Sequence, residues 1–211
     1  MKSIIAIVGK SGSGKTTIVE HLAKTDKVHV LESYTTRPKR SEDETGHIFI
    51  SEEEAIALLK TGLPFAPRDE VLAYNEIGGY KYFALESQIH ERRPTLYIID
   101  PVGVMRMYDN LQGRVPLLII YLHTEQFESL QRLIDSGYTQ EQAYERMGRD
   151  AGCECAMLCD CIIPTTQRPL KDVIADVTLY ISMWIAAEKS NETKAKIHIP
   201  TTGEIFGVMQ K

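Results

Sequence analysis

The chain has no apolar run close to the roughly 20 residues that a membrane-spanning helix needs, and it has no excess of positive charge. Its 24 lysines and arginines are outnumbered by 29 aspartates and glutamates, for a formal net charge of −5. Such a balance disfavours broad binding to nucleic acid or to an anionic membrane. The apolar stretch from Ser3 to Val8 ends at Gly9, too early for a secretory signal. We therefore expect a soluble, cytoplasmic protein that binds neither nucleic acid nor membranes.

Cysteine is confined to one short stretch. All four cysteines lie between Cys153 and Cys161, so the chain has no distributed disulfide framework. Four thiolates suffice for a structural zinc site, but on a helix Cys153 and Cys155 would point about 200° apart. We expect buried thiols instead, and much less than one zinc per chain by elemental analysis. Stoichiometric zinc, lost when Cys153 and Cys159 are both changed to serine, would contradict this.

The order of apolar segments predicts the fold class. The length of 211 residues suits one core domain with insertions, and 43% hydrophobic with 25% charged residues is ordinary for a globular protein. Buried-strand runs occur at Ser3–Val8, Thr95–Asp100 and Val115–Leu122, each followed by a plausible helix. This alternation predicts an α/β fold with a parallel sheet covered on both faces.

Residues 33–84 differ from this pattern and predict an inserted subdomain. They are polar and rich in turns, and they include short alternating stretches typical of a small mixed β-sheet. Ser51 and Glu54 have the spacing of a capping box, which predicts a helix from Glu52 to Lys60. A second capping box, Thr139 with Gln142, predicts an arginine-bearing helix.

The last part of the chain contains one long helix by its periodicity. Apolar residues from Val173 to Trp184 recur at helical spacing, as in an amphipathic helix that packs on the core. Residues 189–211 are expected to form a polar C-terminal extension, with a terminal hairpin from Ile197–Ile199 and Ile205–Val208.

A glycine-rich stretch follows the first expected strand. Residues 9–16 fit the pattern G-x-x-x-x-G-K-[ST] and precede a helix expected from about Lys15 to Lys24. Such a loop aims backbone N–H groups and a helix N-terminus at phosphates. Lys15 would contact the β- and γ-phosphates of a nucleotide, and the Thr16 hydroxyl would hold Mg²⁺. The loop alone is compatible with a kinase, a GTPase or a motor ATPase. The residues expected to bind the nucleotide, ATP in the case of a kinase, are Gly9, Lys10, Ser11, Gly12, Ser13, Gly14, Lys15, Thr16 and Thr17.

Two arginines soon after this loop suggest a second phosphate site. Arg37 and Arg40 are three residues apart, and guanidinium groups pair bidentately with phosphate oxygens. By charge alone, a solvated basic turn is an equally good interpretation. Asp100 ends an apolar strand at the sheet edge where open α/β sheets bind ligands, so it is a candidate ligand of Mg²⁺ through water or a simple cap.

The motifs around these residues resemble those of the guanylate kinase family. The segment Ser33-Tyr-Thr-Thr-Arg-Pro-Lys-Arg40 is similar to the family's acceptor-binding stretch. Residues 79–82, 99–103 and 159–163 are similar to three further family motifs. The resemblance implies a P-loop kinase domain over residues 1–188, a three-layer αβα fold with an acceptor-binding subdomain at 33–84 and a helical lid at 132–150.

The resemblance also implies roles for single residues. The acceptor would contact Ser33, Arg37, Arg40, His47, Tyr82 and Asp100, with His47 at a position where the family has a tyrosine. Lys15, Arg37 and the lid arginines Arg132 and Arg146 would be catalytic, with Arg149 as an additional candidate. Two positions where family members read guanine are Ala73 and Ala84, and one lid arginine is replaced by Ser136.

The sequence therefore predicts an ATP- and Mg²⁺-dependent nucleoside monophosphate kinase, monomeric or homodimeric, that acts on GMP or dGMP. The alternatives are a kinase of another nucleotide or of a phosphorylated sugar such as ribose bisphosphate, and a non-catalytic guanylate-kinase-like interaction module. A GTPase-type switch is disfavoured because the chain has no N-K-x-D motif. A protonated His47 would attract the acceptor phosphate, which predicts a KM for acceptor that rises above about pH 7.

Overall fold

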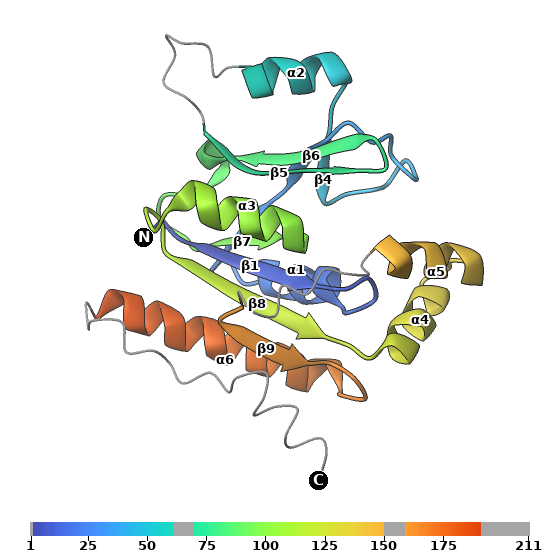
Figure 1. Ribbon diagram of the computed structural model, residues 1–211. Helices are drawn as coiled ribbons and strands as arrows, with labels where there is room; N and C mark the ends of the chain where they lie inside the picture. Colours follow the sequence, from blue (N-terminus) through green and yellow to red (C-terminus); the bar gives the residue numbers. More distant parts are fainter. Residues whose placement is uncertain (1, 61–69, 150–158, 191–211) are drawn as a thin grey trace.

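The computed structural model describes residues 2–60, 70–149 and 159–190. Its main sheet has five strands in the order β2-β7-β1-β8-β9, and every neighbouring pair is parallel (Figure 1). The strands are β1 (Ile4–Gly9), β2 (His29–Leu31), β7 (Thr95–Ile98), β8 (Leu117–His123) and β9 (Cys161–Pro164). The α/β class expected from the sequence is confirmed.

Strand β1 is buried on both faces, because helices cover the sheet on both sides. Ile4, Ala6 and Val8 pack with helix α3 (Pro101–Leu111), whereas Ile5 and Ile7 pack with helices α1 (Lys15–Ala23) and α6 (Leu170–Lys189) (Figure 1). Alternate residues of a strand point to opposite faces, so one apolar run serves two cores. The expected stripe of α6 is confirmed, with Val173, Val177, Ile181 and Trp184 buried.

A second, smaller sheet is inserted between β2 and β7. Its order is β4-β3-β6-β5, with β3 and β4 parallel and the other pairs antiparallel. Its strands are β3 (Ser33–Thr35), β4 (His47–Phe49), β5 (Val71–Ile77) and β6 (Tyr80–Leu85), and a short 3-10 helix, η1 (Glu86–Gln88), follows. Leu72, Ala73 and Ala84 join the core around α3, so the two sheets share one apolar cluster.

Helix α2 (Glu52–Lys60) covers the opposite face of the small sheet. Ala55 of this helix packs against Phe83 and Leu85. The expected capping box is confirmed: Glu54 N donates to Ser51 Oγ at 3.1 Å, and Ser51 N donates to a Glu54 carboxylate oxygen at 2.7 Å. A local pattern of two polar residues thus determines where the helix begins.

Helices α4 (Gln126–Asp135) and α5 (Gln140–Arg149) follow β8. They are separated by a turn in which Gly137 has φ 91°, a left-handed conformation that favours glycine. The second expected capping box is confirmed by reciprocal hydrogen bonds of 3.0 and 3.3 Å between Thr139 and Gln142. Helices α4 and α5 lie beside the carboxyl ends of the main strands (Figure 1).

Some expectations fall outside the described residues. Cys153, Cys155 and the C-terminal hairpin belong to segments that the structure leaves undescribed, so the expectations for them stay predictions. Cys161 is buried in the core beside α6, and Cys159 is partly buried. Among the helices of the described ranges, none combines the length and the apolar character that crossing a membrane requires.

Candidate active site

The loop between β1 and α1 has the close-packed backbone of a phosphate cradle. A Cβ on Gly12, where φ is 78°, would lie 2.6 Å from the Ser129 carbonyl oxygen, so only glycine fits there. Gly14 has φ 91° and directly precedes α1. No side chain caps the first turn of α1, and no acidic residue lies in it. The positive end of the helix is therefore available to an anion.

Lys15 is the first residue of α1, and its ammonium group lies over the loop. Its Nζ donates to the carbonyl oxygens of Gly9 at 2.7 Å and of Lys10 at 2.9 Å. Thr16 and Thr17 follow in the first helical turn, and both are exposed. The glycine cradle, the uncapped helix, the ammonium and the Thr16 hydroxyl fit a polyphosphate with Mg²⁺.

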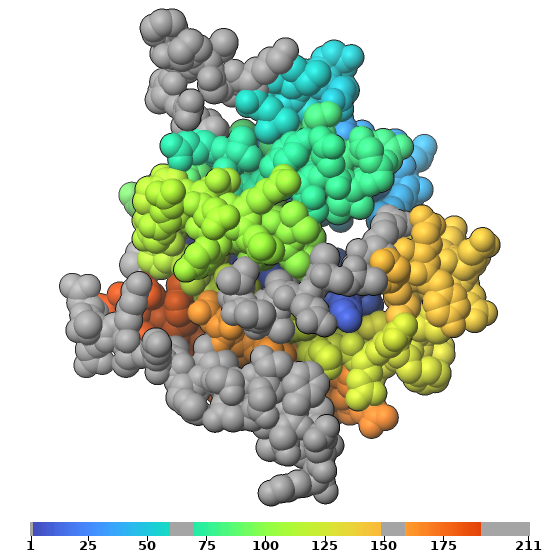
Figure 2. Space-filling view, viewed as in Figure 1, coloured from blue at the N-terminus to red at the C-terminus, as the bar shows by residue number. Residues whose placement is uncertain are grey.

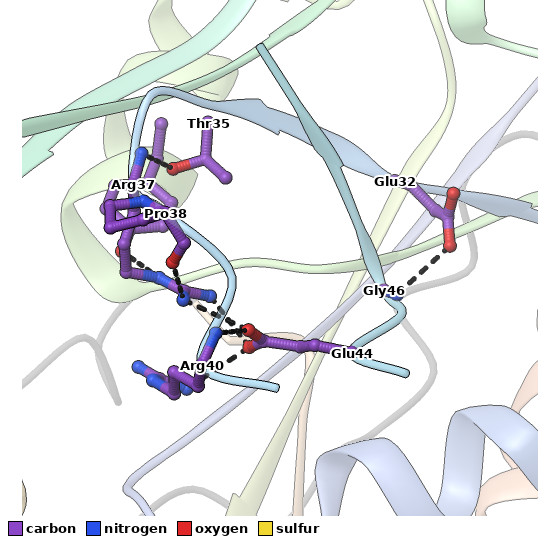
Figure 3. Close-up of polar contacts among 8 residues, drawn as sticks. Glu32, Thr35, Arg37, Pro38, Arg40, Glu44 and Gly46 are labelled. Carbon is purple, nitrogen blue, oxygen red and sulfur yellow. Dashed lines mark hydrogen bonds and ion pairs between the residues drawn. The ribbon is translucent and has the colours of Figure 1, made fainter. Parts of the chain in front are cut away.

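The two arginines of the inserted subdomain converge on one carboxylate, that of Glu44 (Figure 3). Arg37 donates to both Glu44 carboxylate oxygens, at 2.8 and 3.1 Å, and is only 8% exposed. The backbone N–H of Arg40 donates to a Glu44 carboxylate oxygen at 2.5 Å, and a guanidinium nitrogen of Arg40 lies 3.6 Å from the other oxygen. The bonds from Arg37 hold the pKa of Glu44 at about 2. Glu44 therefore fixes both arginines in place.

Tyr82 and His47 surround the same guanidinium. Arg37 Nε donates to the Tyr82 hydroxyl oxygen at 3.1 Å, and the His47 ring meets the Tyr82 ring edge-on at 5.7 Å between centroids. The pKa of His47 is lowered, first by burial and then by the charge of Arg37. Its Nδ1 atom is buried and has no hydrogen-bond partner among the described residues. The cluster is suited to bind a phosphate through a fixed cation and neutral donors.

The lowered pKa of His47 corrects the pH dependence of the acceptor KM that the sequence predicts. Because the pKa of His47 lies below its ordinary 6.5, the ring is neutral at pH 7 and gains its charge only as the pH falls further. The ratio of acceptor KM values for His47→Asn and the unmodified protein should be constant from about pH 7 to 8 and change only on the acid side. Taking this ratio removes the titration of the acceptor itself. A ratio that changes between pH 7 and 8 would contradict the assignment.

Two polar pairs lie farther along the same site. Ser33 Oγ and the hydroxyl of Tyr97 are 2.9 Å apart, and burial raises the pKa of Tyr97. Asp100 is the N-cap residue of α3, and its side chain accepts hydrogen bonds from two backbone N–H groups of the first turn. Its Oδ1 also accepts from Asn75 Nδ2 at 2.9 Å. Sequence reasoning identified Ser33 and Asp100 and missed both partners.

The strand pattern contains a signal for one of these partners, Asn75. Asn75 is two residues beyond Ala73, so it lies on the same face of β5. Tyr97 is two residues from Ile99, so the two share a face of that segment, and both pack in the core on the α3 side of the sheet. A search for polar residues at i+2 from expected site positions finds Asn75.

One cavity of about 260 Å³ brings most of the predicted residues together. Figure 2 shows the surface hollowed between α3 with β5, in green, and α5, in yellow. Asn75 and Tyr97 also line the cavity. The predicted residues in its wall are Gly9, Ser11, Lys15, Ser33, Arg37, Arg40, His47, Tyr82, Asp100 and Arg146.

The three lid arginines have different surroundings. Arg146 lines the cavity, and its guanidinium carbon lies 4.7 Å from the centre of the Tyr138 ring. Arg132 is not part of the cavity wall: it pairs with Glu128 and donates to the Thr165 carbonyl oxygen at 2.8 Å. The side chain of Arg149 lies outside the described residues. Of the two predicted lid arginines whose side chains are described, Arg146 is thus the one that lines the cavity.

No protein-family model and no curated protein sequence matches the chain. Its fold is similar to solved structures, among them the guanylate kinase from Anaplasma phagocytophilum. That comparison has a TM-score of 0.59 at 18% sequence identity and covers 86% of each chain. The protein therefore has a guanylate-kinase-like α/β fold.

Proposed function

We propose that the protein is a nucleoside monophosphate kinase that transfers the γ-phosphate of ATP to GMP or dGMP. One observation carries the proposal: a single cavity is lined by Lys15 of the phosphate loop, by the acceptor arginines and by Arg146. Phosphoryl transfer requires alignment of donor and acceptor and neutralisation of charge, with no covalent chemistry from the protein. Donor and acceptor groups that share one cavity meet that requirement.

Each part of the site has a role in this reaction. The loop N–H groups and Lys15 would bind the donor phosphates, while Arg37 and Arg40 hold the acceptor phosphate in line. Mg²⁺, held by Thr16, would neutralise charge on the donor phosphates. Tyr82 and neutral His47 would donate hydrogen bonds to the acceptor phosphate. Arg146 would stabilise the charge that develops on the transferred group.

The proposal is tested by following ADP release with a panel of acceptors under ATP and Mg²⁺. GMP and dGMP should react faster than AMP, pyrimidine monophosphates or ribose bisphosphate. Much faster turnover of a sugar phosphate or a pyrimidine monophosphate would instead identify the alternative kinase. A folded protein that binds nucleotides and releases no ADP with any acceptor would be the interaction module.

Replacing Arg146 by alanine is expected to lower kcat by about 10²-fold or more and to change the KM for ATP far less. The physical reason is that its charge would act mainly on the transition state rather than on bound ATP. Steady-state kinetics with varied ATP measure both quantities. Arg92→Ala, which removes the same charge from an exposed position outside the cavity wall, is the matched control. An effect confined to KM would make Arg146 a binding residue only.

A further inference from the structure

The acceptor end of the cavity contains one carboxylate. Among the described residues that line it, Asp100 is the only acid, and it shares the wall with the cations Lys15, Arg37, Arg40 and Arg146. A nucleobase seated beyond the phosphate site finds its charged hydrogen-bond acceptor there. The free acceptor capacity of Asp100 therefore influences which N–H groups of a base the site can read.

One oxygen of Asp100 is already fully used. Its Oδ1 accepts from Asn75 Nδ2 at 2.9 Å and from the backbone N–H groups of Val102 and Gly103 at 3.0 Å each. Those contacts fix the carboxylate at the start of α3 and use only Oδ1, so Oδ2 is the oxygen left to accept from a ligand in the cavity that Asp100 lines. An oxygen that already receives three donors has no capacity for a fourth.

Asn75 is held in one orientation by two contacts. Its Oδ1 accepts from the backbone N–H of Glu76 at 2.9 Å, while its Nδ2 donates to Asp100. A flipped amide would oppose oxygen to carboxylate and N–H to N–H, so the donor side is set by the protein. Nδ2 has a second N–H, and Asn75 lines the cavity together with Asp100. The pair thus offers a ligand one donor and one acceptor next to each other.

The other described residues of the cavity wall include no second carboxylate. On the face of β5 that contains Asn75, the preceding residue is Ala73, which is buried and apolar. Across the strand pair, Ala73 is opposite Ala84, also fully buried. The hydroxyls of Ser33 and Tyr97 are paired with each other. Asn75 with Asp100 is therefore the pair in the described wall that combines an amide donor with a carboxylate.

From this geometry, and on the basis of the proposed function, we infer that Asn75 is a specificity-determining residue and that the acceptors are 6-oxopurine nucleoside monophosphates, IMP as well as GMP. The O6 atom and the N1–H group of such a base are an adjacent acceptor and donor that match Asn75 Nδ2 and Asp100 Oδ2. The 2-amino group of guanine would have to share Oδ2 with N1–H, because Oδ1 already accepts three hydrogen bonds, so we expect it to add little to the binding of GMP over IMP. Adenine presents its acceptor and donor in the reverse order at these positions.

The test compares kcat/KM for GMP, IMP and AMP in the unmodified protein, in Asn75→Asp and in Asn75→Ala. In the unmodified protein IMP should react within about 10-fold of GMP, and AMP at least about 10-fold more slowly than both. Asn75→Asp keeps the shape but replaces the donor by an acceptor, so GMP and IMP should lose about 10-fold or more while the KM for ATP stays unchanged. Asn75→Ala removes the donor without adding an acceptor. It should therefore also lower the ratio of kcat/KM for GMP and IMP to kcat/KM for AMP.

Asn110→Ala is the structural control, because Asn110 Nδ2 joins α3 to the carbonyl oxygen of Val71 at 2.8 Å without lining the cavity. It should keep the ratio of GMP to AMP. A GMP preference over IMP above about 100-fold, or an unchanged ratio in Asn75→Asp, would overturn the inference.

Calorimetric binding of the three nucleotides separates this inference from the proposed function. If no nucleoside monophosphate is phosphorylated, the proposed function fails, and the binding ratios in Asn75→Asp and the unmodified protein still decide the role of Asn75. Absence of binding of all three nucleotides would overturn the inference as well.

Discussion

Replacing Lys15 by alanine is expected to lower turnover by about 10²-fold or more and to leave the fold intact. Its Nζ lies over the phosphate loop, 2.7 Å from the Gly9 carbonyl oxygen, where donor phosphates would bind. The Lys15 ammonium is already in position before the reaction. It can therefore stabilise the negative charge that shifts between phosphates in the transition state without any movement of the protein. The measurement is kcat with saturating ATP and acceptor, combined with a thermal unfolding curve.

Lys24→Ala is the control for this change. Lys24 directly follows α1 at the end opposite to Lys15 and is exposed, so its replacement removes the same charge far from the loop. The control should retain normal turnover. Near-normal turnover in a folded Lys15→Ala protein would mean that the loop does not bind the donor as proposed.

Replacing Glu44 by glutamine is expected to weaken acceptor binding and to destabilise the protein by about 2 kcal/mol. The amide places N–H groups against a buried guanidinium and the Arg40 backbone N–H, where a carboxylate now accepts both. Arg37, 8% exposed, loses its charge partner without gaining water. We expect the KM for acceptor to rise by about 10-fold or more, with a much smaller change in the KM for ATP.

The pH dependence of stability gives this prediction a second readout. The pKa of Glu44 is about 2 in the folded protein, below the ordinary 4.5. A depressed pKa means that the pair stabilises the fold fully above pH 4.5, and that this contribution is lost as the pH falls toward 2. Glu44→Gln should lack that part of the acid dependence. The exposed neighbour Glu42, changed to glutamine, should behave like the unmodified protein; if it does not, the effect is not specific to Glu44.

The sequence predicts those parts of the structure that depend on neighbours along the chain. The phosphate loop and both capping boxes each lie within a few residues, and the hydrogen bonds that the two capping boxes predicted are present. Strand β2 was not predicted, because its three residues, His29–Leu31, are too few to show the alternation of a strand.

The acceptor end of the site depends on contacts between distant parts of the chain. Asn75 meets Asp100 across 25 positions, and Ser33 meets Tyr97 across 64. The strand period places Asn75 on the same face as Ala73, but neither pairing is visible in the local sequence, because the small sheet has to pack on α3 before the partners meet. The same holds for Arg132, whose helical position is predictable but whose contact with Thr165 requires β9 to lie beside β8.

The two points at which the inserted segment joins the main sheet lie next to each other. Glu32 is the single residue between β2 and β3, and its carbonyl oxygen accepts from Gln88 Nε2 at 2.9 Å, just after the insertion ends. Strands β2 and β7 on either side are direct neighbours. A segment whose entry and exit adjoin can change in length at its turns remote from α3 without moving the two strand ends that it joins. For the kinase proposed above, such changes would alter the acceptor side of the site and leave the phosphate loop in place.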